Sequence, residues 1–235
     1  MAKMAFLLGT AAAEHQPTEY GFWMSTGNAQ IEVATEGKSA FRVSINYARG
    51  VPQQRSSRML AEQTEYAQFD IQEEAEGTSL HTKFGNIILS NDASFKFSDS
   101  TGRVLVQSDN LSSFDGTHLT AFLGKASTGS DRSTYYGAGA EAGSPLSMDH
   151  STPTVSNHYG AGAVSWAPQY YSVTDRYAAL AVASHDWSDH ADYWTDGQPN
   201  YANYPVNWTS SADGVKWMAE GSSIDIYLMP ADDAY

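Results

Sequence analysis

The chain has 235 residues, 41% of them hydrophobic, which is enough for one large β domain or two small ones. Its formal net charge is −14, and 13 basic residues without a basic cluster argue against nucleic acid or an anionic membrane surface as partner. A neutral ligand is therefore expected. The absence of cysteine excludes disulfides, thiol catalysis and cysteine-ligated zinc.

The N-terminal segment predicts no membrane span. Its only apolar run, Met4 to Ala13, is too short to cross a bilayer. Lys3 ahead of this run and the alanines at 11–13 resemble a secretion signal, but an ordinary start is the favoured interpretation. The compartment stays open, and an extracytoplasmic location is compatible with the sequence.

Alternating apolar and polar residues predict a series of short strands. Along residues 41–47 the odd positions are apolar, and Arg42, Ser44 and Asn46 form the other face, as in a half-buried strand. The same alternation recurs at Phe69/Ile71, Leu80/Thr82/Phe84, Ile87/Leu89, Phe95/Phe97, Val104/Val106, Tyr170/Ser172, Tyr177 to Val182 and Ile224/Ile226/Leu228. Asp99 to Gly102 predicts a hairpin. Helix is expected to be minor, so the predicted fold is all-β, a large antiparallel β-sandwich in one domain.

Residues 137–165 interrupt this pattern with five glycines, two prolines and no apolar period. They predict a long loop held at both ends by strands. Long loops in compact domains are commonly functional. We therefore expect the domain to reach a ligand or a neighbouring domain here.

An ordered set of short motifs runs through most of the chain. In its first half are Tyr66 to Ile71, Leu80-His81-Thr82, Phe95-Lys96-Phe97, Asp99 and Gly102-Arg103-Val104-Leu105. Further along are Tyr136-Gly137-Ala138-Gly139, Pro168-Gln169-Tyr170-Tyr171-Ser172 and Glu220 to Tyr227. Over residues 27–230 this set resembles the N-terminal β-sandwich of glycoside hydrolase family 31, which includes α-glucosidases and α-xylosidases.

The resemblance implies a galactose-mutarotase-like supersandwich that precedes a catalytic (β/α)₈ barrel. In that family the nucleophile and the acid/base are two aspartates of the barrel. A barrel needs roughly 200–250 residues or more, so none fits in this length beside the sandwich. No catalytic residue is therefore carried over. The implied division is a lead-in at 1–26, the sandwich at 27–230 and a tail at 231–235 that leads toward a barrel.

The chain departs from the family pattern within residues 137–165. Ala140 separates the Tyr-Gly-x-Gly motif from Glu141, whereas family members usually place glutamate directly after it. The segment Ser156-Asn157-His158-Tyr159 lacks the tryptophan and the aspartate of the family's Trp-Asn-x-Asp element. These departures weaken the implied contribution of this segment to a sugar subsite. Asp149 is the candidate to take the place of the missing family residues.

Two groups of residues are candidates for substrate binding. Glycoside hydrolysis needs two carboxyl groups across a cleft, and Glu141 and Asp149 are the local pair beside the long loop, although solvated acidic residues are the commoner reading. Aromatic residues among polar ones suit either sugar rings or a domain interface, and Trp187, Trp194 and Trp208 are the candidates. Core packing is expected to take about half of the aromatic residues between Trp187 and Trp217.

Other chemistries receive less support. The cluster His185, Asp186, Asp189, His190 and Asp192 could ligate a metal, but its spacing fixes no third ligand, and a polar loop is favoured. No Gly-x-Ser-x-Gly elbow or Walker loop occurs. We predict no metal and no other cofactor.

Three functions remain open. The first is a non-catalytic domain of an α-glycosidase, which supports the catalytic barrel in the same or another chain and lends a loop to the substrate-pocket entrance. The second is a free-standing carbohydrate-binding or adhesion module. The third is a sugar mutarotase, for which His150, His158 and Glu141 are the candidate acid and base groups.

Overall fold

The computed structural model describes residues 15–26, 28–48, 65–126, 135–137, 169–183, 194–195, 198–199 and 206–231. Within these ranges every regular element is a β-strand, and every strand pair is antiparallel. The predicted all-β fold with the organisation of an antiparallel β-sandwich is confirmed.

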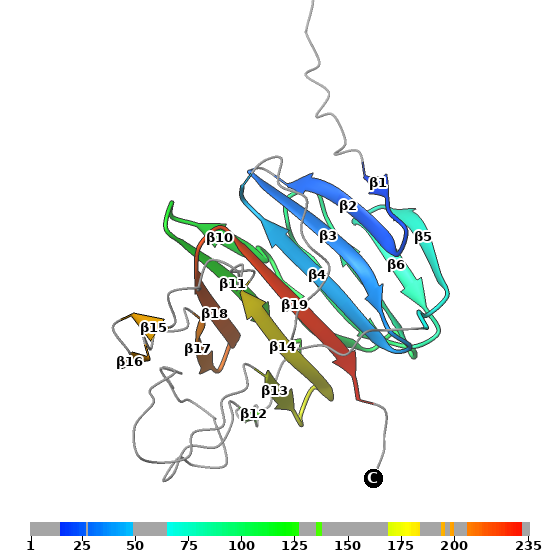
Figure 1. Cartoon of the computed structure of the whole chain (residues 1–235). Helices are drawn as coiled ribbons and strands as arrows, with labels where there is room; N and C mark the ends of the chain where they lie inside the picture. The colour runs from blue at the N-terminus through cyan, green and yellow to red at the C-terminus, as the bar shows by residue number, and fades with distance from the viewer. Residues whose placement is uncertain are drawn as a thin grey trace, which may run out of the picture.

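One layer is an eight-stranded sheet that combines strands from both ends of the chain (Figure 1). In spatial order it contains β1 (Gln16–Pro17), β2 (Gly21–Thr26), β3 (Ala29–Glu36), β4 (Ala40–Asn46), β19 (Ser223–Pro230), β14 (Tyr177–Ala183), β13 (Gln169–Ser172) and β12 (Tyr135–Gly137). Its central pair joins β4 to β19, so the C-terminal strand lies beside one of the first strands.

The second layer consists of two smaller sheets. The five-stranded sheet contains β5 (Phe69–Glu74), β6 (Gly77–Thr82), β7 (Gly85–Leu89), β8 (Phe95–Asp99) and β9 (Val104–Ser108). The four-stranded sheet contains β10 (Ser112–Phe114), β11 (His118–Gly124), β18 (Gly214–Glu220) and β17 (Val206–Ser211). A bridge between Val106 and Lys125 joins these two sheets. A separate two-stranded ribbon contains β15 (Trp194–Thr195) and β16 (Gln198–Pro199).

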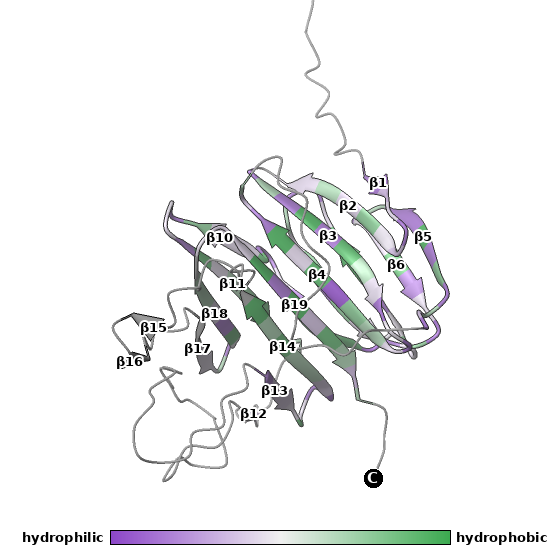
Figure 2. Ribbon diagram, viewed as in Figure 1, coloured by the Kyte–Doolittle hydropathy of each residue, from purple (hydrophilic) through white to green (hydrophobic). Residues whose placement is uncertain are grey.

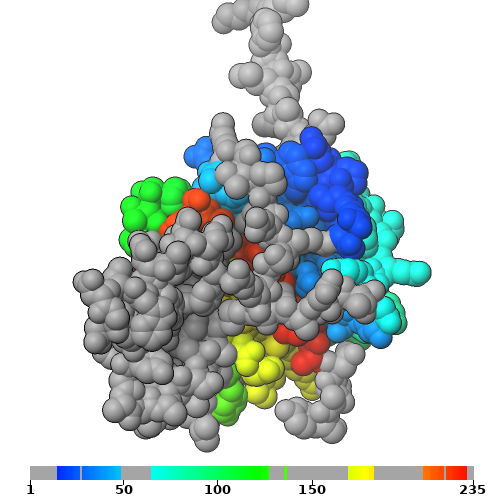
Figure 3. Space-filling view, in the orientation of Figure 1, coloured from blue at the N-terminus to red at the C-terminus, as the bar shows by residue number. Residues whose placement is uncertain are grey.

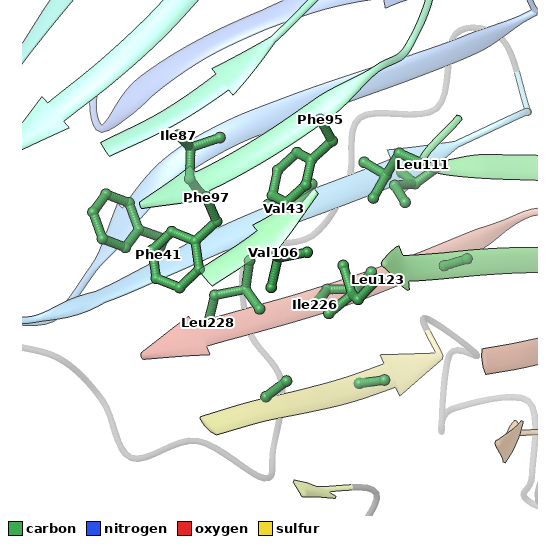
Figure 4. Packing of buried hydrophobic residues seen from close by; sticks show 14 of the residues in the cluster. Phe41, Val43, Ile87, Phe95, Phe97, Val106, Leu111, Leu123, Ile226 and Leu228 are labelled. Atoms are coloured by element: carbon green, nitrogen blue, oxygen red, sulfur yellow. The ribbon is translucent and has the colours of Figure 1, made fainter. Parts of the chain in front are cut away.

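The hydrophobic core lies between the two layers. Figure 4 shows Phe41 and Val43 of the eight-stranded sheet facing Phe97 of the five-stranded sheet, and the rings of Phe41 and Phe97 meet edge to face at 5.5 Å. At the other end, Tyr170 packs on Trp217 of the four-stranded sheet, with ring centroids 5.5 Å apart. Burial of each large apolar side chain contributes roughly 1.5–3 kcal/mol.

The predicted strands are present, with corrections to two of them. Figure 2 shows hydrophobic and hydrophilic residues alternating along β3, β4 and β19. The predicted hairpin joins β8 to β9, where the Gly102 N–H donates to the Asp99 carbonyl at 3.0 Å and Gly102 has a φ of 83°. Phe84, however, lies in the turn after β6 and not in a strand.

The second correction concerns β4, which is buried on both faces. Arg42 and Ser44 are 0% exposed and Asn46 is 6% exposed, so the expected half-buried strand is wrong. Period-two alternation identifies the two faces of a strand but does not reveal whether the polar face meets water. Sequence reasoning also missed the strands β2, β3, β11 and β18, although β11 and β18 carry the same alternation of buried apolar residues.

The domain division remains a prediction. The strands β1 and β2 precede residue 27 and pair within the eight-stranded sheet, where Thr26 lies opposite Ala29. These strands are therefore part of the same layer as β3 and β4.

Candidate functional site

Most of the predicted site residues cannot be placed relative to one another. Glu141, Asp149 and Trp187 lie outside the described residues. Trp194 is in β15, and Trp208 is in β17 opposite Trp217, but the positions of the Trp194 and Trp208 side chains are not described. Their assignment to substrate binding therefore stays a prediction. Trp217 itself is 0% exposed and belongs to the core.

The predicted metal and mutarotase residues also lie outside the described ranges. This applies to the cluster at 185–192 and to His150 and His158. Within the described part of the chain, no group of three His, Asp or Glu side chains is arranged to hold a metal ion. The same part contains no helix with the length and apolar character required to cross a membrane.

The strands β12 and β13 hold both ends of the segment 138–168. They form an antiparallel pair in which Tyr135 lies opposite Ser172 and Gly137 lies opposite Tyr170. The segment therefore leaves and re-enters the eight-stranded sheet at neighbouring positions. This pair confirms that strands flank the predicted long loop.

Aromatic side chains pack beneath this pair on the core side. The rings of Tyr135 and Tyr170 meet edge to face at 5.4 Å, and those of Tyr170 and Tyr177 do so at 5.7 Å. The hydroxyl groups of Tyr170 and Tyr177 share a hydrogen bond of 2.8 Å, and burial raises the pKa of both well above the ordinary value. The cluster fixes the base of the 138–168 segment through packing and one buried hydrogen bond.

The turn that follows β13 is also fixed. The Ser172 hydroxyl donates to the Asp175 carboxylate and accepts from the Asp175 N–H, both at 3.2 Å. The Arg176 carbonyl accepts from the Ala231 N–H at 2.9 Å, just beyond the end of β19. These bonds join β13, β14 and the end of β19 into one unit.

The outer face of the same strands carries exposed apolar side chains. Met229, Ala178, Tyr171 and Tyr136 occupy one row across β19, β14, β13 and β12, as the strand register shows. Tyr136 is 39% exposed, Tyr171 49% and Met229 37%. In Figure 3 the yellow strands β13 and β14 reach the surface beside the red end of β19. We call these four residues the outer row.

A charged cluster occupies the centre of the same outer face. The Arg42 guanidinium donates to the Glu32 carboxylate at 3.0 Å and to the Asp225 carboxylate at 3.2 Å. The Ser44 hydroxyl also donates to Asp225. Burial raises the pKa of Asp225, whereas Arg42 and Ser44 oppose this shift. Burial acts to lower the pKa of Arg42, but the two carboxylates outweigh it and raise that pKa.

This cluster is structural in its chemistry. Glycoside hydrolysis requires two carboxyl groups that face a substrate from opposite sides. Here Glu32 and Asp225 both contact one guanidinium, and Arg42 is fully buried. The sequence offered a signal that could have found the cluster, because the charged residues at 32, 42 and 225 each stand between two large apolar residues.

A second polar constellation does not form a nucleophilic triad. The Ser79 hydroxyl lies 2.8 Å from the Nε2 of His81, and the Glu74 carboxylate lies 3.0 Å from the same nitrogen. A triad needs the serine and the acid on opposite ring nitrogens, so that one orients the imidazole while the other reacts. Hydrogen bonding of Ser79 to the Glu74 carboxylate, the largest cause, and of His81 to it lowers the pKa of Glu74.

Comparison with known proteins shows the fold. No family model matches the chain, and no match is found among curated proteins. Solved structures do match. A family 31 α-xylosidase from a soil metagenome aligns with a TM-score of 0.70 and 12% identity, over 94% of this chain and 32% of its own. The family 31 dextranase of Flavobacterium johnsoniae aligns with a TM-score of 0.67 and 13% identity, over 94% of this chain and 26% of its own.

A third solved structure, the family 31 α-xylosidase of Xanthomonas citri, aligns with a TM-score of 0.67 and 12% identity, over 92% of this chain and 38% of its own. At such identities the likeness concerns the fold alone. The predicted resemblance to the β-sandwich of glycoside hydrolase family 31 is confirmed at that level. The chain spans only about a quarter to two fifths of the length of these three enzymes.

Proposed function

We propose that this chain is a non-catalytic β-sandwich domain of an α-glycosidase that resembles glycoside hydrolase family 31. It supports a catalytic (β/α)₈ barrel, in the same chain or another. It lends the expected loop at 137–165, which lies in the segment bounded by β12 and β13, to the entrance of the substrate pocket. The observation that carries this proposal is the fold likeness, which takes in nearly all of this chain but a minor part of each enzyme.

The base of the 138–168 segment supports the second part of the proposal. The pair β12–β13 rests on the buried cluster of Tyr135, Tyr170 and Tyr177, so both ends of the segment have fixed positions. The outer row lies on the opposite face of the same strands. Exposed Tyr and Met side chains are enriched at protein interfaces, so the outer row is a suitable surface for a partner domain.

The first test is the activity of the chain alone. We expect no hydrolysis of p-nitrophenyl α-glucoside or α-xyloside by the pure chain, because the family's catalytic aspartates belong to the barrel. Turnover that co-elutes with the pure chain and is lost with Glu141→Gln or Asp149→Asn would contradict a supporting role.

The second test addresses the segment in the assembled enzyme, that is, the chain together with its barrel. Because Gly137 and Tyr170 are opposite each other, a linker of about four Gly and Ser residues can join residues 137 and 169 as a hairpin. We expect this replacement to raise KM for oligosaccharides while the unfolding temperature changes little. An unchanged KM would argue against a role at the pocket entrance.

The second candidate function is a free-standing carbohydrate-binding module. The exposed rings of Tyr136 and Tyr171 favour it, because aromatic faces with a polar edge suit sugar rings. Titration of the pure chain with oligosaccharides separates the two functions. A module binds without the barrel, whereas a domain with only a supporting role gives no saturable signal.

A further inference from the structure

A groove lies between the β3–β4 turn, the segment before β5 and the β6–β7 turn. Figure 1 shows β5 and β6 on the opposite side of the sandwich from β12 and β13. The volume of the groove is about 680 Å³, within the range of roughly 300–1,000 Å³ that is typical of ligand pockets. The turn between β3 and β4, the segment that leads into β5 and the turn between β6 and β7 form its walls. The residues that matter below are Lys38, Tyr66, Gln68, Phe69, Thr82 and Phe84.

One wall is fixed by contacts between the two layers. The Ala67 N–H donates to the Gly37 carbonyl at 2.9 Å. The Lys38 ammonium pairs with the Glu65 carboxylate at 2.8 Å. The ring of Tyr66 packs on Tyr20, with centroids 4.3 Å apart. These contacts hold the segment before β5 against the eight-stranded sheet, so this wall exists without a ligand.

The opposite wall is a turn stabilised by its own side chains. The Thr82 hydroxyl accepts from the Phe84 N–H at 3.1 Å and donates to the Gly85 carbonyl at 3.2 Å. The Lys83 ammonium lies 4.8 Å from the centroid of the Phe84 ring. The turn is therefore ordered, and it places an aromatic side chain at the groove.

The groove combines aromatic surface with polar groups that already have partners. Tyr66, Phe69 and Phe84 are half-buried, so part of each remains accessible. Of the charged side chains at the groove, Lys38 pairs with Glu65, and Asp70 accepts from the Gln72 amide at 2.8 Å. His81 contacts Glu74 at 3.0 Å. The remaining charged side chain, Lys83, lies over the Phe84 ring. Two lysines (Lys38 and Lys83) and two carboxylates (Glu65 and Asp70) line the groove, so their charges balance, which favours an uncharged ligand.

The net charge of the whole chain also favours an uncharged ligand over a polyanion. A net charge of −14 disfavours nucleic acids and other polyanions. Aromatic surface together with amide and hydroxyl groups suits a ligand that is uncharged and carries both C–H faces and hydroxyl groups. A short neutral oligosaccharide has this chemistry and fits the volume of the groove.

We propose that this groove binds an uncharged oligosaccharide. The aromatic side chains of Phe84 and Phe69 contact the C–H faces of the sugar rings, while Gln68 and Thr82 bind hydroxyl groups. This site goes beyond the proposed supporting role and does not depend on it, because it uses neither the 138–168 segment nor a barrel.

The test is calorimetric titration of the full chain with neutral trisaccharides, namely maltotriose, isomaltotriose, xylotriose and cellotriose. We expect saturable binding of at least one of them with one site per chain. Phe84→Ala should weaken that binding at least about tenfold, equivalent to 1.4 kcal/mol. Gln68→Ala, at an exposed position, should weaken it without affecting folding. Thermal unfolding of each variant verifies its folding.

The control is Met218→Ala, which removes an exposed apolar side chain from β18 in the four-stranded sheet and touches neither the groove nor the outer row. It should leave binding unchanged. The proposal is overturned if no trisaccharide binds, or if trigalacturonate binds more tightly than all the neutral ones. It is also overturned if folded Phe84→Ala and Gln68→Ala bind as the wild type does. In that case loss of binding in Tyr171→Ala would assign the sugar to the exposed rings of the outer row instead. Hydrolysis and KM, which test the supporting role, are read separately.

Discussion

The two ends of the sandwich bury different kinds of side chain. At the end formed by β2–β9 the core is mainly aliphatic, with phenylalanine, and contains Phe22, Ile31, Val33, Phe41, Val43, Ile45, Leu80, Ile87 and Phe97. At the end formed by β12–β14 and β18 the core contains Tyr135, Tyr170, Tyr177, Ala179, Ala181, Val215 and Trp217. Ala179 lies beside Tyr170 in the register of β13 and β14.

This difference has consequences for the backbone above each end. Aliphatic side chains carry no polar atoms, so the first end needs no buried hydrogen bonds among its core side chains. Tyrosine hydroxyls must find partners when they are buried, as Tyr170 and Tyr177 do with each other. The tyrosine side chains at the aromatic end therefore tolerate fewer orientations than aliphatic side chains do. This end lies beneath the strands that hold the 138–168 segment.

The largest expected effect is at the aromatic end. Trp217→Ala removes the largest fully buried side chain of the described residues and leaves a cavity, so it should lower the free energy of unfolding by about 3–5 kcal/mol. Urea denaturation measures this change. Trp217→Phe should recover part of the loss because it refills part of the volume. Equal losses for the two variants would mean that the ring does not act through its volume.

A somewhat smaller effect is expected on the outer face of the aliphatic end. Arg42→Ala leaves the buried Asp225 carboxylate without its cation and should destabilise the fold by about 3 kcal/mol, the lower end for broken buried pairs. The control is Glu32→Gln, which should cost less because the Glu32 side chain is 24% exposed. If urea denaturation gives the same stability for Arg42→Ala and the wild type, the cluster contributes nothing to the fold.

The smallest expected effect separates hydrogen bonding from packing at the aromatic end. Tyr170→Phe leaves the Tyr177 hydroxyl buried without its partner and should cost about 1–3 kcal/mol. Adding Tyr177→Phe removes the second hydroxyl, so the double variant should be more stable than the sum of the two single effects predicts. If the two single effects measured by urea denaturation add up to the effect of the double variant, the two hydroxyl groups have no coupling energy and their hydrogen bond does not contribute to stability.

The same two variants change the response to alkaline pH. Burial raises the pKa of Tyr170 and Tyr177 well above 10, so the folded chain keeps protons that the unfolded chain loses. The contribution of the two protonated tyrosines to the free energy of unfolding is fully present below pH 10 and declines as the pH rises further. The double variant should therefore unfold at higher pH than the wild type. Identical alkaline midpoints would contradict the raised pKa values.

Much of the local structure could be predicted from the sequence. The alternation along residues 41–47 predicted β4, and Asp99 to Gly102 predicted the hairpin between β8 and β9. The flanking strands of the 137–165 segment were also expected. These features depend on residues close together in the chain, where side-chain period and turn chemistry act directly.

The candidate site was less predictable. The groove combines residues from the β3–β4 turn and from both ends of β5–β6, and no local motif connects Lys38 with Phe84. The outer row likewise depends on register across four strands. Adjacent tyrosines have opposite roles: Tyr135 is 1% exposed and Tyr136 is 39% exposed.

The sequence by itself determined that this chain forms strands and which side chains share a face, because a strand turns successive side chains to opposite sides. Only the tertiary structure decided what each face meets. Arg42 and Asp225, 183 residues apart, become neighbours because β4 pairs with β19. That long-range pairing, which no local period encodes, brings the two charges together on a face that is buried, although the sequence pattern had assigned it to water.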